Sequence, residues 1–325
     1  MTDLKEKLYQ MFILGTEGGN LEPALKNGLG GVIFFTKDIQ SVIQFQKLVE
    51  EIKSISLIPP FLSIDEEGGR VERTENIHKG KKYLSAKYAF DKGSEFLKTQ
   101  TQNIAEELKS YGINLNFAPC IDTNTNPDNP IIGERAFSSN PDDVIKGEKI
   151  VSEIYRKNGI IPCVKHFPGH GDANSDSHLT LPKIDLPLDE MEKTHIKPFK
   201  SAIEKHIEMV MVAHLHCTCF EKDEIPTSLS KTALSYLKNT LNFDGVIISD
   251  DMVMKGVAKF GQIEACEMGI KAGINLFIYR YSTPDIIEII EKIYEKALND
   301  NELRTNIETS YAKIISLKNR YLITK

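Results

Sequence analysis

The chain has 325 residues, of which 41% are hydrophobic and 26% charged, a composition typical of a globular protein with a sizeable core. The formal net charge of −6 argues against nucleic-acid binding, because such a surface needs an excess of basic residues. The N-terminal segment lacks a basic-then-apolar pattern and no stretch approaches ~18 apolar residues, so we expect neither a signal peptide nor a membrane span. The five cysteines lie in apolar runs, which indicates reduced thiols and a cytoplasmic location.

Short apolar runs alternate with longer segments of helical spacing from one end of the chain to the other. Eight of these runs are mostly β-branched or aromatic and apolar throughout, as parallel strands covered on both faces should be. The predicted strands are 11–14, 31–35, 61–64, 113–118, 160–164, 209–213, 246–249 and 275–279. The predicted helices are 84–111, 142–158, 193–206, 229–241, 284–298 and 301–320.

Eight strand–helix units predict an α/β fold, a single closed (β/α)8 barrel of the TIM type over residues 1–325. A doubly wound sheet is the alternative, but no Gly-x-Gly-x-x-Gly turn follows the first predicted strand. No repeat, linker or low-complexity segment divides the chain. One catalytic domain in a monomer is therefore the simplest expectation.

Polar residues gather just after the carboxyl ends of five predicted strands, at the rim where barrel enzymes keep their chemistry. In strand order, these residues are 65–73, Asn116 and Asp122, 165–178, His214 and His216, and Asp250 and Asp251. The segment 165–178 combines lysine, histidine and aspartate with glycines, which a plain turn does not need. The arrangement predicts an active site.

Asp250 follows the apolar run 245–249 and leaves it directly into the rim. A carboxylate in this place can attack an electrophilic carbon or bind a cation. The alternative is that Asp250 or Asp251 caps a helix that begins after Met252. Considered with the other rim residues, Asp250 is interpreted as catalytic.

Asp176 and His178 are two residues apart in a loop with glycines at its start. An adjacent carboxylate favours the imidazolium and can orient the ring, which makes a histidine a usable general acid and base near neutral pH. A surface ion pair is the alternative interpretation, and Asp172 is the competing carboxylate. The glycines predict that the loop from Gly169 to His178 moves in when substrate binds.

Lys165 and His166 end the fifth predicted strand, where they can bind a polar substrate or pair with a carboxylate of the barrel. Asp65, Arg73 and Arg135 allow the same two interpretations. The residues alone leave this choice open.

Four segments resemble glycoside hydrolase family 3, and within it the bacterial β-N-acetylglucosaminidase branch. They are 65–73, 129–135, 165–178 and 249–252. The run Lys-His-Phe-Pro-Gly-His-Gly followed by Asp-Ser-His is highly specific, and the spacing holds over nearly the whole chain. The resemblance implies a retaining exo-β-N-acetylglucosaminidase, or β-N-acetylhexosaminidase, that removes terminal β-linked GlcNAc from cell-wall muropeptides or chitooligosaccharides. It implies no cofactor and no metal.

The resemblance also implies residue roles. Asp250 matches the nucleophile, and His178, oriented by Asp176, matches the general acid/base. The positions that hold the sugar are Asp65, Arg73, Arg135, Lys165 and His166. His214 resembles a further residue of the rim. Asn275 replaces the aspartate of many relatives, a departure that concerns the fine structure of the rim rather than the chemistry.

Three alternatives stay open. A histidine acid repels an incoming anion less than a carboxylate would, so phosphate can compete with water, which would make the chain a β-N-acetylglucosaminide phosphorylase. The second is a metal-dependent barrel hydrolase, because His214-Leu215-His216 is a possible ligand pair. The third is an inactive sugar-binding barrel. The absence of tryptophan favours a short pocket that releases one terminal sugar at a time.

Overall fold

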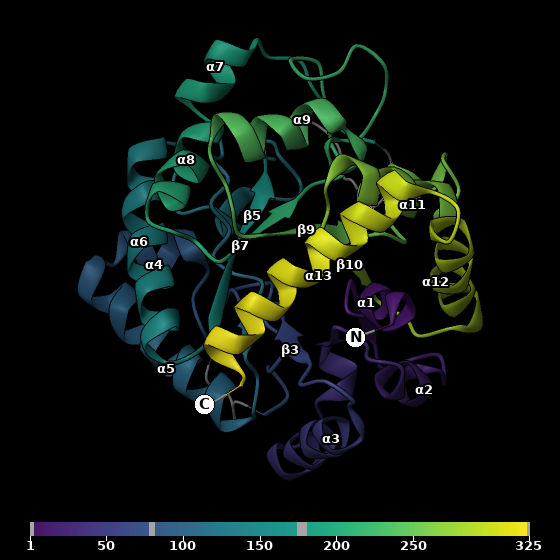
Figure 1. Cartoon of the computed structure of the whole chain (residues 1–325). Coiled ribbons are helices and arrows are strands. Elements are labelled where there is room, and N and C mark those ends of the chain that lie inside the picture. Colours follow the sequence, from purple (N-terminus) through teal and green to yellow (C-terminus); the bar gives the residue numbers. More distant parts are fainter. Residues whose placement is uncertain (1–2, 78–81, 174–180, 324–325) are drawn as a thin grey trace.

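The computed structural model describes residues 3–77, 82–173 and 181–323. Eight parallel strands form a closed barrel in the order β1-β10-β9-β7-β5-β4-β3-β2, with helices around it (Figure 1). The barrel strands are β1 (Phe12–Gly15), β2 (Gly31–Phe34), β3 (Phe61–Ile64), β4 (Leu115–Asn116), β5 (Ile161–Phe167), β7 (Met209–Val212), β9 (Val246–Asp251) and β10 (Leu276–Tyr279). The predicted (β/α)8 barrel is confirmed, with each strand at its predicted place.

Helices follow the strands around the barrel. They are α2 (Leu21–Lys26), α3 (Val42–Ile55), α4 (Ala86–Asp91), α5 (Ser94–Ser110), α6 (Pro141–Lys157), α7 (Leu188–Lys193), α8 (Ile196–Glu204), α9 (Lys231–Ser235), α10 (Lys255–Ala258), α11 (Gln262–Ala272) and α12 (Pro284–Ala297). Two more helices, α1 (Leu4–Tyr9) and α13 (Asn301–Tyr321), lie at the ends of the described chain. The longest, α13, is yellow in Figure 1 and packs on α1, α11 and β9.

The helices differ from the prediction in several places. The expected helix 84–111 is two helices, α4 and α5, because Gly93 between them has a φ of +97°. Six further helices were not predicted, namely α1, α2, α3, α7, α10 and α11. A small two-stranded sheet of β6 (Lys183–Ile184) and β8 (His216–Cys217) was also not predicted, since strands of two residues carry no readable period.

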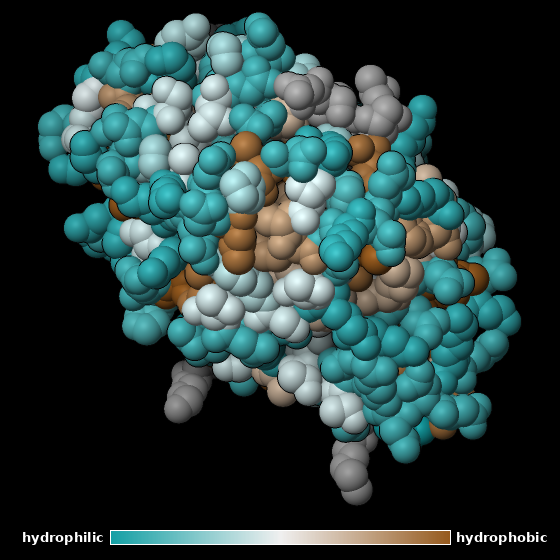
Figure 2. Space-filling model, turned by 90° about the horizontal axis from the view of Figure 1, so that it is seen from above, coloured by the Kyte–Doolittle hydropathy of each residue, from teal (hydrophilic) through white to brown (hydrophobic). Residues whose placement is uncertain are grey.

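The core lies between the strands and the helices. Every residue of β1, β2, β3, β7 and β10 is buried, as expected of parallel strands covered on both faces. On α12 the predicted apolar face of Ile286, Ile290, Ile293 and Ala297 is buried against this core. The face in Figure 2 is mostly hydrophilic, with a smaller group of hydrophobic residues near its middle. No helix within the described ranges is long and apolar enough to cross a membrane.

A buried lysine of α13 closes the amino end of the barrel. Lys318 Nζ donates to Gln10 Oε1 and to the carbonyl of Gly30, both at 2.8 Å, and lies 4.8 Å from the centre of the Phe61 ring. These residues precede or begin β1, β2 and β3. The carboxyl ends of the strands lie at the opposite end of the barrel.

The N-cap of α13 provides a test of the fold. Asp300 Oδ1 accepts from the backbone N–H of Leu303 at 3.0 Å, whereas Thr283, at the corresponding place before α12, makes no side-chain cap bond. We expect Asp300→Ala to lower the free energy of unfolding by about 1 kcal/mol and Thr283→Ala to change it by less than about 0.5 kcal/mol. Urea unfolding measures both values. Equal losses would contradict the assigned caps.

Candidate active site

A pocket of about 180 Å³ opens at the carboxyl end of the barrel. It contains six of the eight predicted site residues, namely Asp65, Arg73, Arg135, Lys165, His166 and Asp250. Asp176 and His178 lie outside the described residues, as do the other residues of 174–180. The remaining lining residues are Ile33, Phe35, Val71, Phe117, Ile131, His170, Met211, Asp251, Ile278 and Arg280.

Lys165 is the centre of a charged network on one wall of the pocket. Its Nζ lies 2.6 Å from Asp65 Oδ1 and 2.6 Å from Glu67 Oε1, although its side chain is only 2% exposed. Arg135 donates to the same Glu67 carboxylate through Nε at 2.9 Å and Nη2 at 2.8 Å. Burial would lower the pKa of Lys165, but Asp65 and Glu67 outweigh it and raise that pKa. The ammonium is therefore charged at neutral pH, and it both pairs with carboxylates and faces the pocket.

Glu67 was part of a predicted rim segment but had no predicted role. Burial would raise the pKa of its carboxyl, but Arg135 and Lys165 outweigh burial and hold that pKa well below its usual range. Glu67 thus fixes two cations of the pocket wall. The sequence signal for a role of Glu67 was its position two residues after Asp65, since alternate residues of an extended segment can reach different partners.

A buried carboxylate behind the pocket shapes the segment that carries Asp65 and Arg73. Glu66 accepts from the backbone N–H groups of Arg73 at 2.8 Å and Thr74 at 3.1 Å. Asn116 binds the backbone of Glu66 through both ends of its amide, each at 2.9 Å. Asn116, a predicted rim residue, is therefore buried inside β4 and supports the rim without lining the pocket.

Arg73 reaches the pocket mouth from this segment. Its Nη2 lies 3.9 Å from Asp65 Oδ2, and its guanidinium carbon lies 5.8 Å from the centre of the Phe35 ring. An arginine over an aromatic face is held by its flat side and keeps its edge free for a polar ligand.

Asp250 enters the pocket from the end of β9, which extends two residues further than predicted. The pairing of β9 with β10 is irregular there: Leu276 pairs with Ile248 and Ile278 pairs with Asp251. Such an irregularity re-aims side chains next to a site. Burial would raise the pKa of Asp250, but the nearby His166, His214 and Lys165 and the backbone N–H of Asp251 outweigh it and lower that pKa. Asp250 is therefore a carboxylate at neutral pH.

Asp251 has a different role from Asp250. Its carboxylate is paired with Arg280 Nε and also accepts from the backbone N–H of Val253 at 3.2 Å. The bond to Val253 closes a local turn, and neither aspartate caps the next helix, α10, whose N-cap residue is Met254. Arg280 was not predicted as a site residue; its position directly after the eighth strand was the available signal.

The two histidines of the His-x-His motif do not converge. His214 Nδ1 lies 2.7 Å from Ser228 Oγ and its Nε2 lies 3.2 Å from the carbonyl of Asp251, whereas His216 Nε2 bonds to the carbonyl of Glu221 at 3.0 Å. The interpretation as a metal-ligand pair is wrong. His214 instead supports the backbone beside Asp250.

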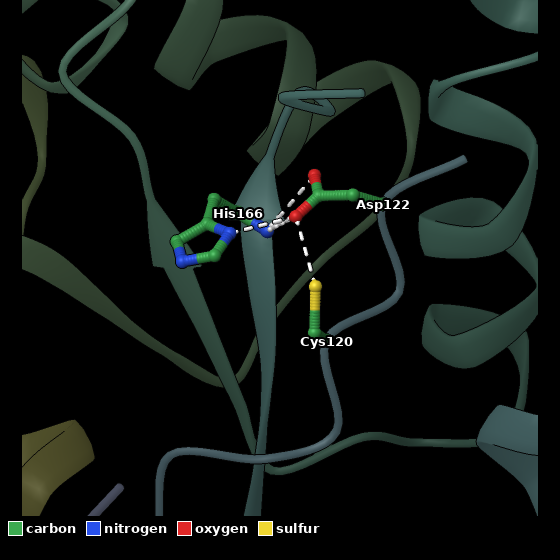
Figure 3. A group of neighbouring side chains, drawn as sticks. All are labelled: Cys120, Asp122 and His166. Carbon is green, nitrogen blue, oxygen red and sulfur yellow. Dashed lines mark hydrogen bonds and ion pairs between the residues drawn. The ribbon is translucent and has the colours of Figure 1, made fainter. Parts of the chain in front are cut away.

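A different group of possible metal ligands lies in the part of the chain that the structure describes: Cys120, Asp122 and His166, whose ligand atoms are within 4.8 Å of one another (Figure 3). These side chains bond to each other, because His166 Nδ1 lies 2.7 Å from Asp122 Oδ2 and Cys120 Sγ donates to the same oxygen at 3.2 Å. Two such ligands of one tetrahedral ion would be ~3.3 Å apart, so the 2.7 Å between His166 and Asp122 is too short for a shared ion. Burial also raises the pKa of the Cys120 thiol well above its usual value. The geometry is that of a hydrogen-bonded cluster, so the residues do not fit a metal.

Asn275 is far from the rim to which it was assigned. It precedes β10, at the amino end of the barrel, where its Oδ1 accepts from the backbone N–H of Ile247 at 2.9 Å and its Nδ2 donates to Ser310 Oγ at 3.0 Å. The interpretation of Asn275 as a rim residue is wrong, because it belongs to the start of the eighth strand and not to its end.

Comparison with known proteins agrees with the fold. Residues 3–317 match the family described as Glycosyl hydrolase family 3 N terminal domain. A beta-hexosaminidase of Actinobacillus pleuropneumoniae is 34% identical over 81% of this chain and 77% of its own length, and Beta-hexosaminidase A of Pseudoalteromonas piscicida is 30% identical over 90% of this chain. The chain belongs to glycosyl hydrolase family 3.

A solved structure with the same fold comes from a relative in this family. The family 3 beta-N-acetylglucosaminidase from Paenibacillus sp. str. FPU-7 superposes with a TM-score of 0.91 at 28% identity, over 99% of this chain and 63% of that one. The chain spans about half the length of the Pseudoalteromonas relative, 53%.

Proposed function

We propose that this chain is a retaining exo-β-N-acetylglucosaminidase, and that Asp250 is its nucleophile. The observation that carries the proposal is the pocket itself, in which an ionised Asp250 faces cations and carboxylates suited to a polar sugar. Relatives named beta-hexosaminidase support the substrate class.

The proposed reaction has two steps. Asp250 attacks the anomeric carbon while protonated His178, oriented by Asp176, gives its proton to the leaving oxygen. The glycosyl–Asp250 ester forms through an oxocarbenium-like transition state as the leaving alcohol departs. Neutral His178 then takes a proton from water, the water oxygen attacks the same carbon, and Asp250 leaves. Two displacements on one carbon return the original β configuration.

The pocket walls supply hydrogen bonds to the terminal sugar. Lys165, Arg135 and Arg73 offer N–H donors, and Asp65 offers acceptors to hydroxyl groups. A cavity of about 180 Å³ is below the ~300–1,000 Å³ of drug-sized ligand pockets, which supports binding of a single sugar ring. Release of one terminal residue at a time follows from such a short pocket.

The natural substrate and the compartment are part of the same proposal. We assign the terminal GlcNAc of cell-wall muropeptides or chitooligosaccharides as the substrate, cleaved by a monomer in the cytoplasm. All five cysteines are free thiols, which supports a reducing compartment.

Release of nitrophenol tests the activity. Wild-type protein is expected to hydrolyse the 4-nitrophenyl β-N-acetylglucosaminide and to leave the β-glucoside nearly intact. Equal rates would contradict the N-acetyl preference, and no turnover of either would favour the inactive sugar-binding barrel. Repeating the assay with phosphate distinguishes water from phosphate as acceptor, since a phosphorylase would form a sugar 1-phosphate.

Metal removal is expected to have no effect on this activity. The possible ligands Cys120, Asp122 and His166 bond to one another, and the proposed chemistry uses only carboxylate and imidazole groups. We expect incubation with excess EDTA followed by gel filtration to leave kcat/KM within about twofold, where an open catalytic zinc site would be inactivated. Loss of activity restored by Zn²⁺ would favour the metal-dependent alternative.

A further inference from the structure

We propose that Asp122 is a positioning residue: it holds His166 as the Nδ1-protonated tautomer, with the Nε2 lone pair directed to the sugar pocket. The inference rests on the proposed function, in which His166 binds the terminal sugar. Asp122 follows β4 and makes no part of the pocket lining, so any effect on substrate must act through another residue.

The Asp122 carboxylate is surrounded by donors, although its side chain is 0% exposed. It accepts from the His166 ring at 2.7 Å and from the Cys120 thiol at 3.2 Å, as Figure 3 shows. It also accepts from two backbone N–H groups, those of His166 at 3.3 Å and His170 at 2.6 Å. A carboxylate with this many donors is held in one orientation, and so is the ring that it faces.

The second ring nitrogen of His166 determines where the proton lies. Arg135 Nη2 is 3.3 Å from His166 Nε2, and a guanidinium has donors only. His166 Nε2 must therefore accept, which leaves the ring proton on Nδ1, opposite Asp122. Arg135 is itself fixed by two bonds to Glu67. Two independent partners, one on each side of the ring, thus favour the same tautomer.

The tautomer matters because the pocket wall is otherwise rich in donors. Lys165 and Arg135 can only donate, and Arg73 at the mouth can only donate. An unprotonated His166 Nε2 adds an acceptor among them; its one lone pair faces Arg135 Nη2 at 3.3 Å in this structure, and a hydroxyl or amide hydrogen of the sugar would share or replace that donor. In the opposite tautomer the proton would be on Nε2. This N–H would face the donors of Arg135 and could not accept a hydrogen from the sugar.

Asp122 also fixes the backbone from which the catalytic loop departs. Its bonds to the N–H groups of His166 and His170 span the turn between β5 and the loop to His178. Burial would raise the pKa of Asp122, but His166 and His170 outweigh it and hold that pKa well below its usual range. The charge that orients the ring is therefore present throughout the neutral range.

The test reads the tautomer directly. Long-range ¹H–¹⁵N correlation spectra of the imidazole nitrogens distinguish Nδ1–H from Nε2–H, and the His166→Gln variant assigns the His166 signals. Wild-type protein is expected to show Nδ1–H at pH 7.5. Asp122→Asn, which offers fewer acceptors to the same donors, is expected to lose this single form. Cys120→Ser, another donor to the same carboxylate, is expected to keep it.

The kinetic readout is made on the same proteins. We expect Asp122→Asn to lower kcat/KM by about 10- to 100-fold, mainly through KM, and Cys120→Ser to change it by less than about threefold. A wild-type spectrum with Nε2–H, or an Asp122→Asn spectrum with an unchanged tautomer, would overturn the inference. The wild-type spectrum needs only a folded His166→Gln protein for its assignment and no glycosidase activity, so failure of the proposed function is seen separately in the nitrophenol assay.

Discussion

Asp250→Ala is expected to lower kcat/KM for the aryl β-N-acetylglucosaminide by roughly 10⁴-fold or more, because loss of a nucleophile removes the covalent route altogether. The substitution should leave the fold intact, since within the described ranges the side chain of Asp250 accepts only the backbone N–H of Asp251 at 2.8 Å. Initial rates of nitrophenol release measure the loss, and the circular dichroism spectrum checks the fold.

The adjacent aspartate provides the matched control for this variant. Asp251→Asn removes the same charge one residue away, where the carboxylate binds Arg280 and the N–H of Val253. We expect a loss of about tenfold, the cost of one weakened hydrogen bond. Azide should also restore turnover of Asp250→Ala by occupying the vacated space and forming the α-glycosyl azide. If Asp251→Asn is the more severe variant, the nucleophile assignment is wrong.

Lys165→Met is expected to lower the free energy of unfolding by about 3–5 kcal/mol, because it leaves the partly buried carboxylate of Asp65 and the buried carboxylate of Glu67 without their shared cation. The same variant loses a donor to the sugar, so we expect kcat/KM to fall about 100-fold. Urea unfolding measures the free energy of unfolding, and nitrophenol release at low urea concentration measures kcat/KM.

A surface ion pair of equal length is the control that separates the effect of burial from the effect of losing a charge. Lys197 Nζ lies 2.6 Å from Asp142 Oδ1, the same distance as in the Lys165 pairs, but the two side chains are 41% and 61% exposed. Lys197→Met should change the free energy of unfolding by at most about 1 kcal/mol. Similar losses for Lys165→Met and Lys197→Met would contradict the network described for the pocket wall.

The barrel could be predicted from the sequence because each parallel strand is buried on both faces and therefore apolar throughout. The helices were harder to predict from the sequence. The helix α3 has its own signals, a Ser41 side chain that accepts from the N–H of Gln44 and buried Phe45, Val49 and Ile52, yet its exposed side includes Ile43, which blurs the pattern. The break at Gly93 depends on a positive φ, which glycine permits but does not require.

The rim residues could be predicted because the carboxyl ends of all the strands meet at one end of a barrel. Their partners could not be, since contacts such as Lys165 with Asp65 join residues 100 positions apart. The error at Asn275 has the same origin. A residue at the start of a strand lies at one end of the barrel and a residue at the end of that strand lies at the other, and the sequence pattern did not separate the two. Asp122 was found at the rim, but only its distances to His166 and His170 indicate a role.

The anomer released first tests the central claim most directly. Proton NMR spectra recorded in the first minutes of hydrolysis distinguish β-N-acetylglucosamine from the α form that mutarotation produces later. Nucleophilic catalysis by Asp250 predicts that the β anomer appears first and that the α anomer follows at the mutarotation rate. Initial release of the α anomer would show a single displacement by water and would contradict the covalent Asp250 intermediate.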